Sequence, residues 1–176
     1  MPPADLTLRL ADGTPIRLRP PRPADAGVLG RLVEALSPDD RRRRFHGAVR
    51  ALSAATLDRM VAPAPATTLA LVAEDPHGGL VADVRAVLDA TGRDAEFGLM
   101  VATAWQGRGL GRLALRALCA AAAARGWGWL YGHVLADNVP MLGLVARCGF
   151  RASPRRGDPG VVVVEARLEQ AMPLAA

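Results

Sequence analysis

Ala95-Glu96-Phe97-Gly98-Leu99-Met100-Val101, followed after a short loop by Gln106-Gly107-Arg108-Gly109-Leu110-Gly111-Arg112, is the stretch that decides the fold of this chain. Its first part is an apolar run typical of a strand, and its second part is a glycine-rich turn that opens a long helix, predicted over residues 109–125. Three glycines within five residues let a ligand come close to the backbone. The first helical turn offers unpaired N–H groups at the positive end of the helix dipole. We therefore predict a diphosphate-binding site at this turn.

The spacing of this turn differs from two common phosphate-binding motifs. The dinucleotide fingerprint needs G-x-G-x-x-G, and a P-loop needs a glycine followed by lysine and then serine or threonine. Here the pattern is Gln-x-x-Gly-x-Gly, formed by Gln106, Gly109 and Gly111. The turn is therefore neither a dinucleotide fingerprint nor a P-loop.

Length and composition fit a single domain, residues 1–176, with 51% apolar residues to fill its core. No apolar run reaches the roughly 18 residues of a membrane span, and the N-terminus shows no signal-peptide pattern. We therefore expect a cytoplasmic protein with no membrane partner. All 22 basic residues are arginine and the formal net charge is +5, which suits a polyanionic ligand. Nucleic acid is not expected as a partner, because the chain has no recognition motif and few aromatic residues for stacking.

The two cysteines, Cys119 and Cys148, are too few for a disulfide framework. Cys119 lies on the apolar face of a predicted helix and Cys148 lies near the end of another, so both are expected to be small core residues. No spacing of metal ligands is apparent in the sequence. We therefore expect neither a cysteine nucleophile nor a metal ion.

Alternation, turn residues and caps predict an α/β (α+β) protein. Asp12-Gly13 is a hairpin signal, and Ser37 followed by Pro38 is a strong helix start. The link between strands 94–101 and 129–135 through the long helix makes a local parallel pair. The expected architecture is a central mixed, mostly antiparallel twisted sheet of about seven strands flanked by helices. Strands are predicted at 6–10, 16–18, 67–73, 80–88, 94–101, 129–135, 150–152 and 161–168, and helices at 25–36, from Ser37, at 53–60, at 109–125 and from Asn138.

Two motifs resemble the GNAT superfamily of N-acetyltransferases. The Gln-x-x-Gly-x-Gly turn is similar to the acyl-CoA pyrophosphate loop of that superfamily, and the segment from Asn138 to Phe150 is similar to its element that ends in Gly-Phe. The order of the predicted elements is also the GNAT order, with the sheet splayed at the acyl-CoA groove. Within the superfamily the chain most resembles the catalytic domain of bacterial Pat-type protein-lysine acetyltransferases, through residues 12–20, 36–41, 44–45, 95–97, 105–111 and 138–150.

The resemblance implies that acetyl-CoA is the co-substrate and lies along the opening stretch. The backbone of Leu99, Met100 and Val101 would bind the pantetheine arm, and one N–H near Met100 would polarise the thioester carbonyl. Asn138 would hydrogen-bond the arm, cap its own helix, or do both. The diphosphate would be bound by the turn, with either of its two arginines nearby: Gln106, Gly107, Arg108, Gly109, Leu110, Gly111 and Arg112.

Glu96 is the candidate general base, since it stands at the position of the catalytic glutamate in Pat-type enzymes; the alternative is an ordinary carboxylate at a strand end. His133 borders the same groove and is either an alternative base or a hydrogen-bonded structural residue. Asp83, on the neighbouring strand, either contacts the substrate ammonium or is a solvated residue. Val145 stands where many members of the superfamily have a tyrosine acid, so protonation of the leaving thiolate is left to water.

The run from Arg41 to Arg44 is expected to be mainly a solvated helix face. Arg41 and Arg44 are three residues apart and so share one side of the helix. From there they could recognise acidic residues around a target lysine, or a phosphate of CoA.

The leading functional prediction is an acetyl-CoA-dependent N-acetyltransferase that works by direct attack, with a protein lysine as acceptor. A small amine, such as an amino acid, a polyamine or an antibiotic, is the alternative acceptor. A non-catalytic acyl-CoA-binding sensor is the alternative from a different class: Glu96 favours the enzyme, and Val145 favours the sensor. Exposed edge strands make a homodimer possible.

Overall fold

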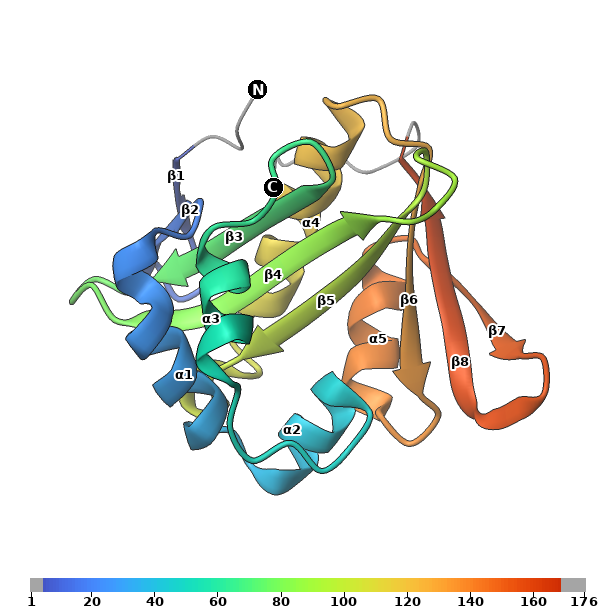
Figure 1. Ribbon diagram of the computed structural model, residues 1–176, viewed down its shortest axis with the longest axis horizontal. Helices are drawn as coiled ribbons and strands as arrows, with labels where there is room; N and C mark the ends of the chain where they lie inside the picture. Colours follow the sequence, from blue (N-terminus) through green and yellow to red (C-terminus); the bar gives the residue numbers. More distant parts are fainter. Residues whose placement is uncertain (1–4, 169–176) are drawn as a thin grey trace.

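The computed structural model describes residues 5–168. Its strands form one eight-stranded sheet in the order β1-β2-β3-β4-β5-β6-β8-β7 (Figure 1). Neighbouring strands are antiparallel except β5 and β6, which are parallel. The predicted fold class is therefore confirmed, and each of the eight ranges predicted as strands overlaps a strand of this sheet, whose size had been put at about seven. The strands are β1 (Leu6–Arg9), β2 (Pro15–Arg19), β3 (Thr68–Glu74), β4 (Leu80–Leu88), β5 (Ala95–Val101), β6 (Trp129–Leu135), β7 (Arg151–Arg155) and β8 (Asp158–Arg167).

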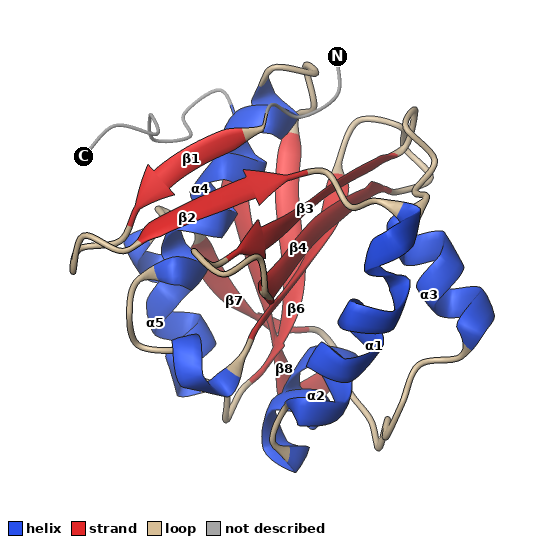
Figure 2. Ribbon diagram, turned by 90° about the vertical axis from the view of Figure 1, so that its left-hand side faces the viewer, coloured by secondary structure: helices blue, strands red, loops and turns tan. Residues whose placement is uncertain are grey.

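Five α-helices cover the two faces of the sheet. Figure 2 shows α4 and α5 on one side and α1, α2 and α3 on the other. None of the helices in the described part of the chain is long and apolar enough to cross a membrane. The helices are α1 (Ala26–Ala35), α2 (Pro38–Phe45), α3 (Ala54–Val61), α4 (Leu110–Ala123) and α5 (Val139–Arg147).

Both faces of the central strands are buried, because successive side chains of a strand point to opposite sides. On β3, Leu71 belongs to the apolar cluster beneath α4, and the next residue, Val72, belongs to the cluster beneath α1 and α3. On β5, Phe97 lies in the first cluster and Met100 in the second. Glu96, Gly98 and Met100 alternate along β5 and therefore lie on the same face, the one that α1, α2 and α3 cover.

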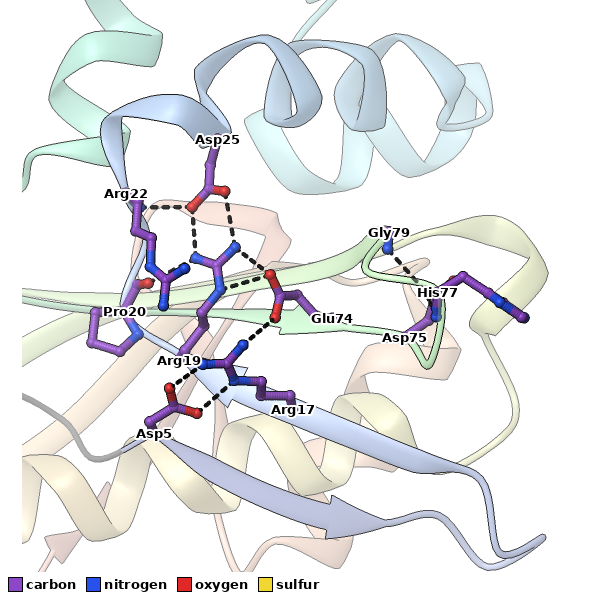
Figure 3. Close-up of polar contacts among 10 residues, drawn as sticks. All are labelled: Asp5, Arg17, Arg19, Pro20, Arg22, Asp25, Glu74, Asp75, His77 and Gly79. Atoms are coloured by element: carbon purple, nitrogen blue, oxygen red, sulfur yellow. Dashed lines mark hydrogen bonds and ion pairs between the residues drawn. The ribbon is translucent and has the colours of Figure 1, made fainter.

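A network of ion pairs joins β2 to β3 and to the short 3-10 helix η1 (Pro23–Asp25) that precedes α1 (Figure 3). The side chain of Arg19 is only 4% exposed and donates to both carboxylate oxygens of Asp25, at 2.7 and 2.9 Å. It also donates to Glu74 through Nε at 2.8 Å. Arg17, on the same face of β2, is 44% exposed and contacts Asp5 and Glu74. One buried arginine therefore fastens the start of α1 to the sheet.

Candidate active site

The groove that contains the predicted site residues opens where β5 and β6 separate. The two strands pair only through Ala95 with Leu130 and Glu96 with Tyr131, and beyond these pairs they diverge (Figure 1). Next to the point of separation, a Cβ on Gly132 would lie 2.8 Å from the Phe97 ring, so the ring needs a glycine there. The resulting groove has a volume of about 740 Å³ and is lined by both strands, the glycine-rich turn, α2 and the start of α5.

Backbone groups of β5 face this groove with a regular alternation. Ala102 N–H donates to Val81 O at 2.8 Å, in register with the β4–β5 ladder. Hydrogen-bonded residue pairs alternate with non-bonded pairs along an antiparallel ladder. The N–H and C=O groups of Met100 therefore bond to β4, and the N–H and C=O groups of Leu99 and Val101 point away from β4. The Val101 carbonyl accepts from Gln106 Nε2 at 3.1 Å. The main chain of Leu99 and Val101 is therefore the part of β5 that a ligand in the groove can bind.

The glycine-rich turn has the backbone that its sequence predicts. Gly107 and Gly109 have φ of 72° and 86°, a region that favours glycine, and Gly109 is the N-cap of α4. A Cβ on Gly111 would lie 2.7 Å from Leu144 Cδ1, so this glycine allows α4 to approach α5 closely. Leu110 points into the core, where it is fully buried. The turn thus contributes Gln106, three glycines and Arg112 to the groove lining, and Leu110 stays outside it.

The two arginines of the turn have different surroundings. Arg112 lines the groove. Arg108 points away from it and donates to Asp12 at 2.7 Å and to Thr14 Oγ1 at 3.0 Å, with its guanidinium over the ring of Trp105. Hydrogen bonds from Thr14 and then from Arg108 hold the pKa of the Asp12 carboxyl below its usual range. Of the two, Arg112 is the one placed to meet a ligand phosphate.

Glu96 and His133, which the sequence offers as alternative bases, form one pair. His133 Nδ1 lies 2.9 Å from Glu96 Oε1 at the end of the groove where β5 and β6 begin to separate. The side chain of Glu96 is 52% exposed and that of His133 is 26% exposed. The pair can therefore be reached from solvent and can take up a proton there.

Asn138 lines the groove and also caps α5, because its Oδ1 accepts from the Met141 N–H at 3.3 Å. Val145 is 1% exposed and packs in the core, outside the groove lining. The single tyrosine of the chain, Tyr131, lies outside the groove lining too, with its hydroxyl 3.5 Å from Asp89. Within residues 5–168, therefore, no tyrosine side chain lines the groove.

Arg41, Arg44 and Asp83 are not the solvated residues that one interpretation of the sequence predicted, and Asp83 does not line the groove where it could contact a substrate ammonium. Arg41 turns back to α1 and donates to the carbonyls of Glu34 and Leu36, both at 2.7 Å. Arg44 is partly buried in the groove lining, and Asp83 is fully buried beside Arg85, whose Nε donates to it at 3.0 Å. The burial of Arg44 and Asp83 was missed from the sequence because it is produced by elements that are distant in the sequence.

Both cysteines are buried, outside the groove lining. Burial raises the pKa of the Cys119 thiol to about 12, and burial also raises the pKa of Cys148. Across the described residues, no group of three histidine, cysteine or carboxylate side chains is placed to hold a metal ion. The two thiols are therefore core residues in the structure.

Solved structures similar to this one come from several acyltransferases. The GNAT domain of S. lividans PAT is 27% identical, covers 93% of this chain and 96% of its own, and has a TM-score of 0.86. A cAMP-binding acyltransferase from Mycobacterium smegmatis is 25% identical over 97% of this chain, with a TM-score of 0.65. This chain spans 48% of the length of that protein.

A more distant likeness concerns the fold alone. Spermidine N-acetyltransferase from Vibrio cholerae, solved with CoA and spermine, is 18% identical over 88% of this chain and 96% of its own, with a TM-score of 0.71.

The family model of the acetyltransferase (GNAT) domain matches residues 16–151, most of the chain. The similarity to the S. lividans PAT domain also confirms the expected likeness to Pat-type catalytic domains. The chain therefore belongs to the GNAT family of acetyltransferases and is an N-acetyltransferase.

Proposed function

We propose that this protein transfers an acetyl group from acetyl-CoA directly to the ε-amine of a protein lysine. The observation that carries the proposal is the Glu96–His133 pair, at 2.9 Å, at the end of a groove that starts at a glycine-rich turn. A base and a diphosphate site at opposite ends of one strand, turn and helix suit a thioester laid between them.

The groove supports one orientation of acetyl-CoA. The N–H groups from Gly107 to Gly111 and the side chain of Arg112 suit the diphosphate, whereas the Gln106 N–H already donates to Thr103 O at 3.2 Å. The main chain of Leu99 and Val101 suits the amides of the pantetheine arm, and their N–H groups, rather than that of Met100, are the donors available to the thioester carbonyl. Asn138 lines the same groove. The thioester then lies toward Gly98, and the amine toward Glu96.

The chemistry requires the acceptor ammonium to lose a proton before it attacks. Glu96, oriented by His133, takes that proton directly or through a water molecule. The amine then attacks the thioester carbonyl carbon, a C–N bond forms and the C–S bond breaks. The nitrogen gives up its second proton, and the CoA thiolate takes one from solvent, since Val145 offers no acid. The balance is acetyl-CoA plus ammonium going to amide, CoA thiol and one proton.

A protein lysine is the proposed acceptor for two reasons. The likeness to Pat-type domains reaches 27% identity over 93% of the chain. The Glu96 side chain is 52% exposed, so a lysine on the surface of another protein can reach it. Polyamine acceptors find less support, because the spermidine N-acetyltransferase is only 18% identical.

Incubation with isotopically labelled acetyl-CoA and host lysate, followed by mass spectrometry, tests this proposal. This chain contains no lysine, so its own side chains add no acetyl-lysine background. We expect labelled lysines on other proteins, and labelling of small amines alone would refute the proposed acceptor. Glu96→Gln is expected to lower turnover by about 10²–10⁴-fold while acetyl-CoA affinity persists. Unchanged turnover in this variant would refute the role of Glu96.

A further inference from the structure

Arg44, on α2, lies flat against the backbone of β5. A Cβ built on Gly98 would meet its guanidinium at 2.6 Å from Nη2, 2.7 Å from Cζ and 2.9 Å from Nη1. Glycine in a strand interior often marks such a close approach. The guanidinium therefore occupies the place of a side chain on the face of β5 that also carries Glu96.

In the part of the chain that the structure describes, this guanidinium has no counter-ion bonded to it, and its Cζ lies 5.2 Å from the centre of the Phe45 ring. Within residues 5–168 no group accepts a hydrogen bond from Arg44, and its buried Nε is without a partner. Burial lowers the pKa of Arg44, and the negative charges of nearby Asp83 and Glu96 partly offset this lowering. The guanidinium remains a cation at neutral pH. Asp83 is already bonded to Arg85, at 3.0 Å, and Glu96 to His133, at 2.9 Å.

The other arginines of α2 have partners. Arg41 donates to two carbonyls of the α1 end, Arg42 pairs with Asp137 at 2.6 Å, and Arg43 lies 3.8 Å from Asp40. Arg43 and Arg44 both line the groove with a buried Nε that has no hydrogen-bond partner, but Arg43 also has an ion pair with Asp40, and among the described residues Arg44 has none. A desolvated cation without a partner is costly, and the cost is recovered when an anion joins it.

The position of Arg44 places that anion beside the reacting atoms. Gly98 and Glu96 are two residues apart on β5, which separates them by roughly 6.6 Å. In the proposed orientation of acetyl-CoA, the acyl group and the attacking amine both lie in this interval. The planar fork of a guanidinium matches a carboxylate through two parallel hydrogen bonds.

We propose that Arg44 is a specificity-determining residue that binds a carboxylate carried next to the reaction centre. This inference rests on the proposed function and sharpens its substrate class. The carboxylate has two possible sources: the far end of a dicarboxylic acyl group on CoA, such as succinyl, or an acidic group beside the acceptor amine.

Two measurements distinguish these sources. The first is the affinity of the wild type, Arg44→Gln and Arg44→Lys for succinyl-CoA and for butyryl-CoA, which has the same chain length without the carboxylate. The second is thiol release from acetyl-CoA with a lysine peptide flanked by glutamates and with the same peptide flanked by glutamines. Arg42→Gln, which removes one charge from the same helix outside the groove lining, is the matched control.

We expect the wild type to favour the carboxylate in one of the two measurements by about 10- to 100-fold, the worth of a charge-assisted pair. Arg44→Gln should abolish that preference, Arg44→Lys should restore part of it, and Arg42→Gln should retain it. No preference in either measurement, or one that survives in Arg44→Gln, would overturn the inference. The measurements on the wild type alone can show that the preference is absent, so they can overturn the inference even where a variant fails to fold.

The failure of the proposed function would look different. The first measurement needs no acceptor, so it tests Arg44 even in a protein that binds acetyl-CoA without transferring the acetyl group. Binding with no turnover on any amine would overturn the proposed function alone.

Discussion

Replacing Arg19 by methionine is expected to destabilise the protein by about 3–5 kcal/mol, because the change leaves buried Asp25 without its ion-pair partner and takes from Glu74 one of its two arginine partners. Asp25 is 7% exposed, and Glu74 has a side chain that is 14% exposed. Both accept hydrogen bonds from the Arg19 guanidinium (Figure 3). Methionine fills a similar volume, so the effect measured is that of the lost charge rather than of a cavity.

Arg17→Met is the matched control. Arg17 lies on the same strand and also contacts Glu74, but its side chain is 44% exposed. An exposed pair of this kind contributes only about 0–1 kcal/mol. At about 2–4 °C per kcal/mol for a chain of this size, Arg19→Met is expected to lower the melting temperature by roughly 6–20 °C, and Arg17→Met by at most about 4 °C.

Urea denaturation of the two variants and the wild type, at neutral and at acid pH, measures the difference. The hydrogen bond from Arg19 is the main cause that lowers the pKa of Asp25 in the folded state. The stabilisation it reflects is complete above the unfolded pKa, about 4, and is lost as the pH falls through the lower folded value. The gap between wild type and Arg19→Met should therefore narrow at acid pH. Equal, small effects of the two substitutions at neutral pH would refute the reasoning.

Three further outcomes are expected. Arg112→Gln should weaken acetyl-CoA binding by about 10-fold or more in a calorimetric titration, and Arg108→Gln should weaken it less; the reverse order would contradict the placement of the diphosphate. Gly132→Ala should cost about 1–3 kcal/mol in urea denaturation, because its Cβ would lie 2.8 Å from the Phe97 ring, and a neutral substitution would show that the ring can move freely. Cys119 should resist alkylation at pH 8 in the native protein, since burial raises the pKa of its thiol to about 12, and rapid labelling seen by mass spectrometry would disprove that burial.

Features that depend on neighbouring residues were predictable from the sequence. Ser37 caps α2 as expected, accepting from the Asp40 N–H at 3.1 Å, and Asn138 caps α5. The long helix, predicted over 109–125, spans Leu110–Ala123. Glycine turns, helix caps and apolar periodicity depend on residues only a few positions apart, so the local sequence is enough to predict them.

Features that depend on distant partners were not predictable. Arg44 looks like its three neighbours in the sequence, and only its contact with β5, more than fifty residues away, distinguishes it. Asp83 reads as a solvated residue until the sheet and the helices bury it. Gly98 is the residue whose type points to this contact, since a glycine inside a strand suggests that another group packs closely against the backbone. The pairing of Glu96 with His133 likewise follows from a parallel contact of only two residue pairs.

The separation of β5 from β6 leaves the main chain of β5 after Glu96 without a neighbouring strand on that side. A linear ligand with amide groups can complete the sheet there, held by the main chain of Leu99 and Val101. Main-chain recognition does not depend on which side chains those residues carry. The donor site can thus stay intact while side chains around it change, so that α2 and the strand ends are free to adapt the protein to a different acceptor.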